Sequence, residues 1–458
     1  MLRISDVSVS YEGERVLEHI DLSFKKGEVS VITGGSGSGK STLIKLINGI
    51  IPEVIKARVQ GDISYGEVDL MKMDISERSD YVSTVFQNPK TQFYCTGTTD
   101  EIAFGMENRG IDREEIKRRI AVYSQLLKTS HLLGRDLFRL SGGEKQMVAI
   151  TAVACMEQDI CIFDEPSSSL DRESIGQLKY AIEKLKEMGK IVIIAEHRLY
   201  YLKDLADHFY VLKDGRILET DRNETAVQTY GLRRIEEIRK EELKSGPYFE
   251  KDVFSKDFRA EERLLCADYR YSYTRGRPVF DMNFSLEGEV NFIIGNNGVG
   301  KTTFIRSLCG LQRKFKGRTC FDKEELKHPE ELISLVMQDV NYQLFTDSVW
   351  QEISIVTEED EIKERVLEEV GLLSKKDVHP QKLSGGEKQR LSIALCKASK
   401  KPIVIFDEPT SGLCKETMMK IIRFIHSMKE EGKLVLIVTH DYEFIRNCGG
   451  RIIEFVKD

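Results

Sequence analysis

Two glycine-rich segments of the sequence are suited to binding phosphate. Residues 34–42 read GGSGSGKST and residues 295–303 read GNNGVGKTT, and each follows an apolar run typical of a β-strand. Glycine allows backbone N–H groups to approach phosphate oxygens closely, and the helix expected to begin in each segment adds the positive end of its dipole. The two segments therefore predict two sites for the phosphates of a nucleotide.

The side chains of these loops have different predicted tasks. Lys40 and Lys301 would reach the β- and γ-phosphates, whereas the hydroxyls of Ser41 and Thr302 would be ligands of Mg²⁺. The residues predicted to bind nucleotide are Gly34, Gly35, Ser36, Gly37, Ser38, Gly39, Lys40, Ser41 and Thr42 in the first loop and Gly295, Asn296, Asn297, Gly298, Val299, Gly300, Lys301, Thr302 and Thr303 in the second.

An acidic pair follows a later apolar run in each half of the chain. A carboxylate at the end of a buried strand can lie opposite the phosphates, so Asp164 and Asp407 are predicted to hold Mg²⁺. The next residues, Glu165 and Glu408, would then orient or deprotonate an attacking water molecule. The alternative is that each acidic pair caps the helix that follows it.

Histidines and glutamines recur at matching places and complete the predicted sites. His197 and His440 each follow a third apolar run, from which the imidazole could reach the γ-phosphate as a catalytic group. Gln87 and Gln338 could contact the bound magnesium or the attacking water. The alternatives are a structural histidine at the end of a strand and an ordinary polar loop residue.

One tyrosine lies upstream of each phosphate loop at a similar distance. Tyr11 and Tyr273 could stack on the adenine ring of a nucleotide, because an aromatic side chain offers a flat apolar face. Each of them could equally be a tyrosine of the hydrophobic core.

The elements that must position these residues also occur twice. FQNPKTQF at 86–93 matches MQDVNYQLF at 337–345, and LSGGEKQ begins at residues 140 and 383. In the same way ICIFDEP matches IVIFDEP, and IVIIAEH matches LVLIVTH. Matches in one order at a spacing of roughly 250 residues indicate duplication rather than a solenoid. The sequence predicts two homologous domains, residues 1–222 and 261–458, joined by a charged linker, residues 223–260.

An α/β fold is predicted for each domain. Short apolar runs rich in β-branched residues alternate with longer helical patterns, which is typical of a mostly parallel sheet with covering helices. In the linker, Leu232, Ile235 and Ile238 are spaced at helical intervals and predict one amphipathic helix.

The composition narrows the class of protein. The chain of 458 residues is 41% hydrophobic and 31% charged, and no run approaches the roughly 18 apolar residues that span a bilayer. The first residues lack the features of a secretory signal, so the cytosol is expected. The nine cysteines are scattered singly and are expected to be reduced, and the net charge of −7 argues against a nucleic-acid partner.

The LSGGE segments resemble the signature of the ATP-binding cassette (ABC) ATPases, and the resemblance covers nearly the whole chain. In that family each domain is a sheet core with a helical subdomain, and the signature of one domain closes over the γ-phosphate that the other holds. The resemblance therefore implies two ATP molecules sandwiched between the halves, with Mg²⁺. It assigns nucleotide contacts to Ser141, Gly142 and Gly143 and to Ser384, Gly385 and Gly386.

The segments after Gln87 and Gln338 resemble the ATPases of energy-coupling-factor (ECF) importers. This resemblance implies an ATPase on the inner face of the cell membrane that energises uptake of a vitamin or transition metal. Its partners would be a transmembrane coupling subunit and a small substrate-binding membrane protein. The surface for the coupling subunit is predicted beside Gln87 and Gln338, where Phe93, Tyr94, Tyr342 and Phe345 are expected to be exposed; the alternative is that these side chains are buried within their own domain. The alternatives are a soluble mechanical ABC ATPase and the tandem ATPase of another ABC importer.

One substitution distinguishes the two halves. SSLD at 168–171 matches SGLC at 411–414, so Cys414 replaces the aspartate of the first half, Asp171. In the family this segment touches the opposite ATP site, and a thiol accepts hydrogen bonds only weakly. The substitution predicts two unequal sites; the alternative is that water or a neighbour replaces the carboxylate with little effect.

Overall fold

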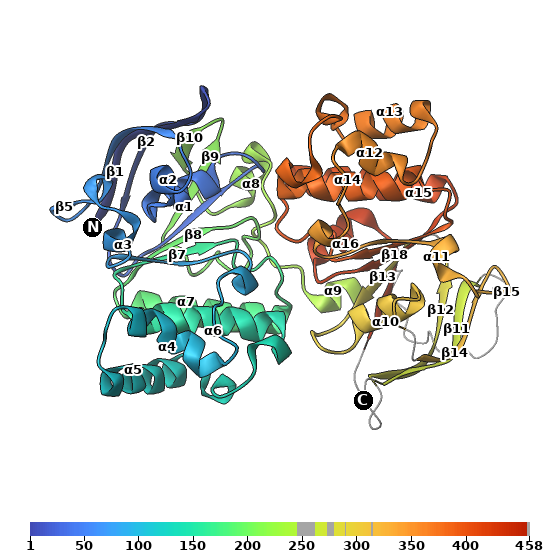
Figure 1. The fold of residues 1–458 in the computed structure, drawn as a ribbon, viewed down its shortest axis with the longest axis horizontal. Helices are drawn as coiled ribbons and strands as arrows, with labels where there is room; N and C mark the ends of the chain where they lie inside the picture. The colour runs from blue at the N-terminus through green and yellow to red at the C-terminus, as the bar shows by residue number, and fades with distance from the viewer. Residues whose placement is uncertain (245–261, 273–278, 289, 313–314, 456–458) are drawn as a thin grey trace. The chain divides into compact units, whose positions relative to one another are not determined.

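The computed structural model describes residues 1–244, 262–272, 279–288, 290–312 and 315–455. The chain forms two compact units. The first contains Met1–Glu237 and Cys414–Glu416, and the second contains Ile238–Leu413 and Thr417–Asp458 (Figure 1). Each unit has its own sheets, its own helices and its own buried cores.

The first unit has one mostly parallel sheet and one antiparallel sheet. The parallel sheet has the order β10-β9-β3-β8-β7-β6, in which only β10 is antiparallel to its neighbour. Its strands are β3 (Val29–Gly34), β6 (Val82–Val85), β7 (Ile160–Asp164), β8 (Ile191–Ala195), β9 (His208–Lys213) and β10 (Arg216–Glu219). The antiparallel sheet has the order β2-β1-β4-β5, with β1 (Leu2–Tyr11), β2 (Glu14–Phe24), β4 (Arg58–Tyr65) and β5 (Val68–Asp69).

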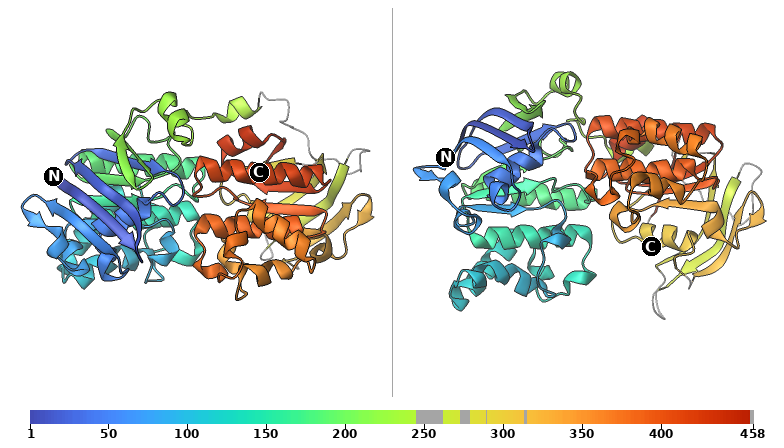
Figure 2. Two further views of the ribbon diagram at one scale, coloured as in Figure 1. Left: turned by 90° about the horizontal axis from the view of Figure 1, so that it is seen from above. Right: turned by 45° about the horizontal axis from the view of Figure 1, so that its top comes forward.

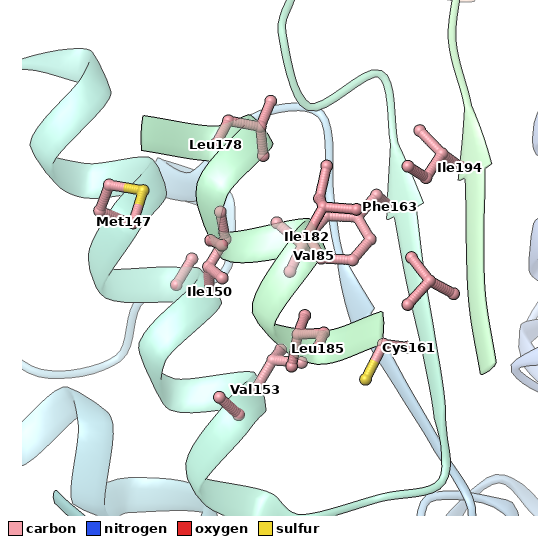
Figure 3. Close-up of a cluster of buried hydrophobic side chains, with 14 of the residues drawn as sticks. Val85, Met147, Ile150, Val153, Cys161, Phe163, Leu178, Ile182, Leu185 and Ile194 are labelled. Carbon is pink, nitrogen blue, oxygen red and sulfur yellow. The ribbon is translucent and has the colours of Figure 1, made fainter. Parts of the chain in front are cut away.

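Strand β7 alternates its side chains between two cores, as a strand buried on both faces must. Cys161 and Phe163 pack against helices α6 (Gly142–Met156) and α7 (Arg172–Glu187), as Figure 3 shows. Ile160 and Ile162 point to the opposite face, where they join the core around helix α1 (Lys40–Ile47) and the antiparallel sheet. Helices α4 (Thr98–Asn108) and α5 (Arg113–Leu126) extend the first of these cores.

The second unit repeats this arrangement. Its parallel sheet has the order β16-β17-β18-β13-β19, formed by β13 (Val290–Ile294), β16 (Ile333–Val336), β17 (Ile403–Asp407), β18 (Leu434–Val438) and β19 (Arg451–Glu454). The antiparallel strands β11 (Glu262–Tyr271), β12 (Phe280–Glu287), β14 (Phe315–Phe321) and β15 (Glu324–Glu325) form a separate layer, yellow to green in Figure 2. The predicted mostly parallel α/β fold is confirmed for both units.

The helices of the second unit follow the order of the first. Those of six or more residues are α10 (Lys301–Leu308), α12 (Val349–Ser354), α13 (Asp360–Glu369), α14 (Gly385–Ala398), α15 (Lys415–Glu430) and α16 (Tyr442–Cys448). Among the described residues, no helix combines the length and apolar content needed to cross a bilayer.

The predicted linker helix is wrong. Leu232, Ile235 and Ile238 lie in an irregular segment between α8 (Glu224–Tyr230) and α9 (Lys240–Lys244). Leu232 and Ile235 are buried in a core of the first unit, whereas Ile238 is buried in a core of the second. A helix would have placed the three side chains on one face, whereas they are buried in two different cores. Residues 245–260 of the predicted linker lie outside the described residues, and the domain boundaries remain predictions.

Candidate functional site

The first phosphate loop joins the end of β3 to the start of α1. Gly34 has φ +151°, and a Cβ atom there would lie 2.2 Å from the carbonyl oxygen of Leu212. Gly39 has φ +104°, and a Cβ atom there would lie 2.7 Å from Leu17. Both positions therefore require glycine. The buried hydroxyl of Ser38 has no hydrogen-bond partner among the described residues, and a phosphate oxygen would supply one.

The second loop has the same backbone shape between β13 and α10. Gly295 has φ +148°, and a Cβ atom there would lie 2.4 Å from the carbonyl oxygen of Phe455. Gly300 has φ +103° and immediately precedes α10. Both loops thus have the strand–loop–helix setting predicted for a phosphate site.

The two loop lysines lie across their own loops. The ammonium group of Lys40 donates hydrogen bonds to the carbonyl oxygens of Gly34 at 3.1 Å and Gly35 at 3.0 Å. Lys301 donates to the equivalent oxygens of Gly295 and Asn296 at 2.6 and 2.9 Å. Burial lowers the pKa of Lys40. Each loop therefore holds a cation at the place where phosphate oxygens are expected.

The predicted magnesium ligands are the last residues of β7 and β17, Asp164 and Asp407. Burial raises the pKa of Asp164, and it raises the pKa of Asp407 to about 6 although a hydrogen bond with Thr302 acts in the opposite direction. That hydrogen bond brings together two predicted magnesium ligands of the second unit. A hydroxyl and a carboxylate at one place fit a small cation that prefers oxygen ligands.

In the first unit, three predicted residues meet at Glu165. The side-chain amide of Gln87 donates a hydrogen bond to Glu165 Oε2 at 2.8 Å, and His197 Nε2 lies 3.5 Å from Glu165 Oε1. Burial raises the pKa of Glu165 to about 8. Burial, with the charges of Lys40 and Arg233, lowers the pKa of His197 well below its usual value, so the imidazole is neutral.

The second unit holds Glu408 differently. His440 Nε2 again lies 3.5 Å from the carboxylate, at Oε1, and it also lies 3.1 Å from Asn297 Oδ1 in the phosphate loop. The hydroxyl of Thr439 donates to Glu408 Oε2 at 3.2 Å. Gln338 is exposed. Sequence reasoning missed Thr439, although it stands directly before a predicted histidine.

The glutamates themselves have a constrained backbone. Glu165 has φ +45° and Glu408 has φ +51°, conformations that are uncommon for residues other than glycine. The N–H of Glu165 donates to the carbonyl of Ala195 at 2.8 Å, and that of Glu408 donates to the carbonyl of Val438 at 2.9 Å. Each glutamate is therefore fixed to the neighbouring parallel strand just before its histidine.

Only one of the two tyrosines predicted to stack on adenine lies among the described residues. The hydroxyl of Tyr11 donates to Thr42 Oγ1 at 3.4 Å, and its ring packs, partly buried, against the core. This position lies beside the phosphate loop, and the stacking role remains a prediction. Tyr273 lies outside the described residues.

The LSGGE segments begin two long helices. Ser141 is the N-cap of α6 and forms a capping box with Glu144, and Ser384 does the same for α14 with Glu387. Ser141 and Ser384 are exposed, as are Gly142 and Gly385, the first glycines of the two helices. An exposed, well-capped helix N-terminus can receive an anion.

Asp171 caps helix α7, where its side chain accepts a hydrogen bond from the N–H of Ser174 at 2.9 Å. The alternative role of the acidic pair Asp164 and Glu165 as a helix cap is therefore wrong for the first unit. Cys414 takes the matching position before α15. A thiol accepts backbone hydrogen bonds more weakly than a carboxylate does.

The fold and the site geometry define a nucleotide-binding protein built from two P-loop domains. The ABC transporter family model matches residues 17–168 and 279–411. An ABC transporter ATP-binding protein of Treponema denticola is 39% identical over 99% of this chain and 95% of its own length. One from Methanosarcina mazei is 30% identical over 100% of this chain and 93% of its own.

The chain belongs to the ABC transporter family, as a tandem ATP-binding protein with ATPase activity. Among solved structures, a chain from the model of ribosome-bound archaeal Pelota and ABCE1 matches this fold with a TM-score of 0.66 at 23% identity. The match covers 98% of this chain and 76% of the matched chain. At this identity the similarity is one of fold alone.

Proposed function

We propose that the chain is the ATPase of an energy-coupling-factor type importer, located on the inner face of the membrane. The observation that carries this proposal is a loop that is built in the same way in both units and presents an exposed aromatic side chain in each. The relatives named as ABC transporter ATP-binding proteins match this chain over nearly their whole length, which supports a transport role.

A glutamine ties each loop to its own sheet. Gln92 donates to the carbonyl of Thr84 in β6 at 3.1 Å and accepts from the N–H of Phe86 at 3.3 Å. Gln343 donates to the carbonyl of Leu335 in β16 at 2.7 Å, and its Oε1 accepts from the N–H of Met337 at 2.7 Å. The two loops therefore have the same internal support.

A glutamate then fixes the residue that is presented. Glu101, near the start of α4, accepts a hydrogen bond from the N–H of Tyr94 at 2.9 Å, and Glu352 in α12 accepts one from Phe345 at 3.2 Å. Tyr94 is 78% exposed and Phe345 is 74% exposed. A rigid backbone that holds a large aromatic ring in solvent is typical of a protein docking site.

The other two predicted aromatics differ from each other. Tyr342 is 81% exposed, as predicted. Phe93 is not, because its ring packs against the core of the first unit, just as the matching Leu344 is buried in the second. The proposed docking surface therefore consists of Tyr94, Tyr342 and Phe345, and its proposed occupant is a transmembrane coupling subunit.

The chemistry of the proposed sites follows from their geometry. Glu165 and Glu408 would accept the proton of the attacking water. The pKa of Glu165, about 8, lies near the working pH, which suits that carboxyl to the role. His197 and His440 would position the terminal phosphate. Ser41 with Asp164 and Thr302 with Asp407 would hold Mg²⁺, which would supply positive charge against the phosphate oxygens.

Purification from native membranes tests the proposed function. The full chain, extracted in mild detergent, should carry multi-span membrane proteins in fixed proportion and a vitamin or transition metal identifiable by mass spectrometry. The importer role would be contradicted if the chain is extracted without any membrane protein, or if it sediments with ribosomes. The likeness to ABCE1 concerns the fold only, so the mechanical alternative has no observation in its favour.

Charge substitution tests the docking surface. Tyr94→Glu together with Phe345→Glu should reduce co-purification of the transmembrane subunit at least about tenfold, because a buried unpaired carboxylate opposes docking. ATP affinity should not change. Val122→Glu, at an exposed apolar position on α5, is the matched control. Equal co-purification of parent and double variant would exclude this surface.

A further inference from the structure

Glu196 has a buried carboxylate that accepts four hydrogen bonds. Glu196 is 1% exposed to solvent. Oε1 accepts from the N–H groups of His197 at 2.7 Å and Arg198 at 3.0 Å. Oε2 accepts from the N–H of Ser167 at 3.3 Å and the hydroxyl of Tyr201 at 2.9 Å. Burying a carboxylate is unfavourable unless it is fully hydrogen-bonded, and here donors surround it.

These donors come from two different segments. His197, Arg198 and Tyr201 follow β8, whereas Ser167 follows Glu165 at the end of β7. Arg198 adds a second link, because its guanidinium donates to the carbonyl of Ser167 at 3.2 Å. The carboxylate therefore spans the gap between the segment of Glu165 and the segment of His197.

The second unit makes the same connection with other groups. Thr410, which matches Ser167, donates its hydroxyl to Asp441 Oδ2 at 2.8 Å. The N–H of Asp441 donates to Thr439 Oγ1 at 3.1 Å, and Thr439 in turn donates to Glu408. Thr439 and Asp441 occupy the positions of Glu196 and Arg198 in the repeat. One function is thus served by a single carboxylate in the first unit and by a threonine–aspartate pair in the second.

We propose that Glu196 is a positioning residue of the first site, where it holds Glu165 and His197 at the separation that hydrolysis requires. The proposal rests on the hydrolytic roles proposed above for those two residues. The 3.5 Å distance between His197 Nε2 and Glu165 Oε1 is the quantity that Glu196 fixes. Loss of that constraint displaces groups that act on the terminal phosphate, while the phosphate loop that binds ATP stays intact.

The test measures kcat and KM for ATP hydrolysis and the Tm of the purified full chain. In a Glu408→Gln background, which removes hydrolysis at the second site, Glu196→Thr should lower kcat by about tenfold to a hundredfold, because small displacements of reacting groups have effects of that size. KM should change by less than about threefold, since the contacts of the phosphate loop remain. Tyr201→Phe, which removes one of the four donors, should lower kcat less.

A triple variant tests whether the hydrogen-bonded groups of the second unit restore kcat in the first. Ser167→Thr, Glu196→Thr and Arg198→Asp together rebuild in the first unit the groups found in the second, and this triple variant should recover kcat to within about threefold of the parent. Asp159→Asn is the control for stability alone. It replaces one acceptor oxygen with an NH2 group and removes the charge that faces Lys26. The side chain can then no longer accept from Lys26 and Tyr65 through two oxygens at the opposite end of β7, so Tm should fall while kcat stays unchanged.

Unchanged kcat in Glu196→Thr or in Tyr201→Phe would overturn the proposal. A fall of kcat, ATP affinity and Tm together that the triple variant does not reverse would also overturn it, because that pattern indicates only a structural role. Failure of the hydrolytic assignment is distinguishable, since Glu165→Gln would then keep the parent rate whatever Glu196→Thr does.

Discussion

Replacing Glu165 by glutamine should make the stability of the first unit less sensitive to pH. Burial raises the pKa of this carboxyl from its ordinary value of 4.5 to about 8. The folded protein keeps the proton up to about pH 8, whereas the unfolded chain loses it near pH 4.5. The stability associated with the protonated carboxyl is therefore fully present below pH 4.5 and is lost as the pH rises through 8. Glutamine does not titrate, so the variant escapes this loss.

The magnitude follows from the two pKa values. Their difference of about 3.5 corresponds to about 5 kcal/mol above pH 8 and to about 3 kcal/mol at pH 7. In a domain of this size about 1 kcal/mol changes Tm by roughly 2–4 °C. The Tm of Glu165→Gln relative to the parent should therefore rise by about 6–12 °C between pH 4.5 and pH 7.

Differential scanning calorimetry without nucleotide and with a chelator measures this difference, because bound cations would stabilise the ionised carboxylate. Glu183→Gln is the matched control, since Glu183 is exposed on α7. The control should follow the parent at every pH. A Tm difference for Glu165→Gln that stays constant with pH, or that shrinks as the pH rises, would refute the burial argument.

Glu165→Gln combined with Glu408→Gln should reduce ATP hydrolysis by at least about a hundredfold while ATP remains bound in a filter assay, and hydrolysis at the parent rate would contradict the water-activating role. Gly34→Ala should lower ATP affinity or prevent folding, because its Cβ would lie 2.2 Å from the carbonyl oxygen of Leu212, and normal affinity measured by calorimetry would show that the loop tolerates the side chain. If Cys414 makes the two sites unequal, the two single glutamine variants should differ in residual ATPase activity and become equal in a Cys414→Asp background. Equal activities in both backgrounds would show that the thiol has no functional effect.

The sequence predicted the parts of the site that depend on where strands end. A short apolar run buried on both faces must be a central strand, and a polar residue directly after it must lie at the edge of the sheet. This reasoning places Asp164 and Asp407 correctly. It does not reach Glu196 and Thr439, because a search for matching residues discards positions at which the two halves differ.

Local periodicity failed where tertiary contacts decide the backbone. Leu232, Ile235 and Ile238 have the spacing of a helix, but two separate cores bury them and their segment is irregular. Phe93 was predicted to be exposed because it stands in a polar loop, yet it packs against the core of its unit. Neither result is encoded in the spacing of neighbouring residues, since each depends on surfaces formed by distant parts of the chain.

The alternation of side chains along β7 restricts how this protein can evolve. Ile160 and Ile162 serve one core, Cys161 and Phe163 serve the other, and Asp164 follows at once. Inserting or deleting a single residue would exchange the two faces and shift the acid by about 3.3 Å along the strand. The strand can therefore accept substitutions of similar size but no change of length. The turn at residues 109–112, between α4 and α5, has no such constraint and is where length variation among descendants of this sequence should accumulate.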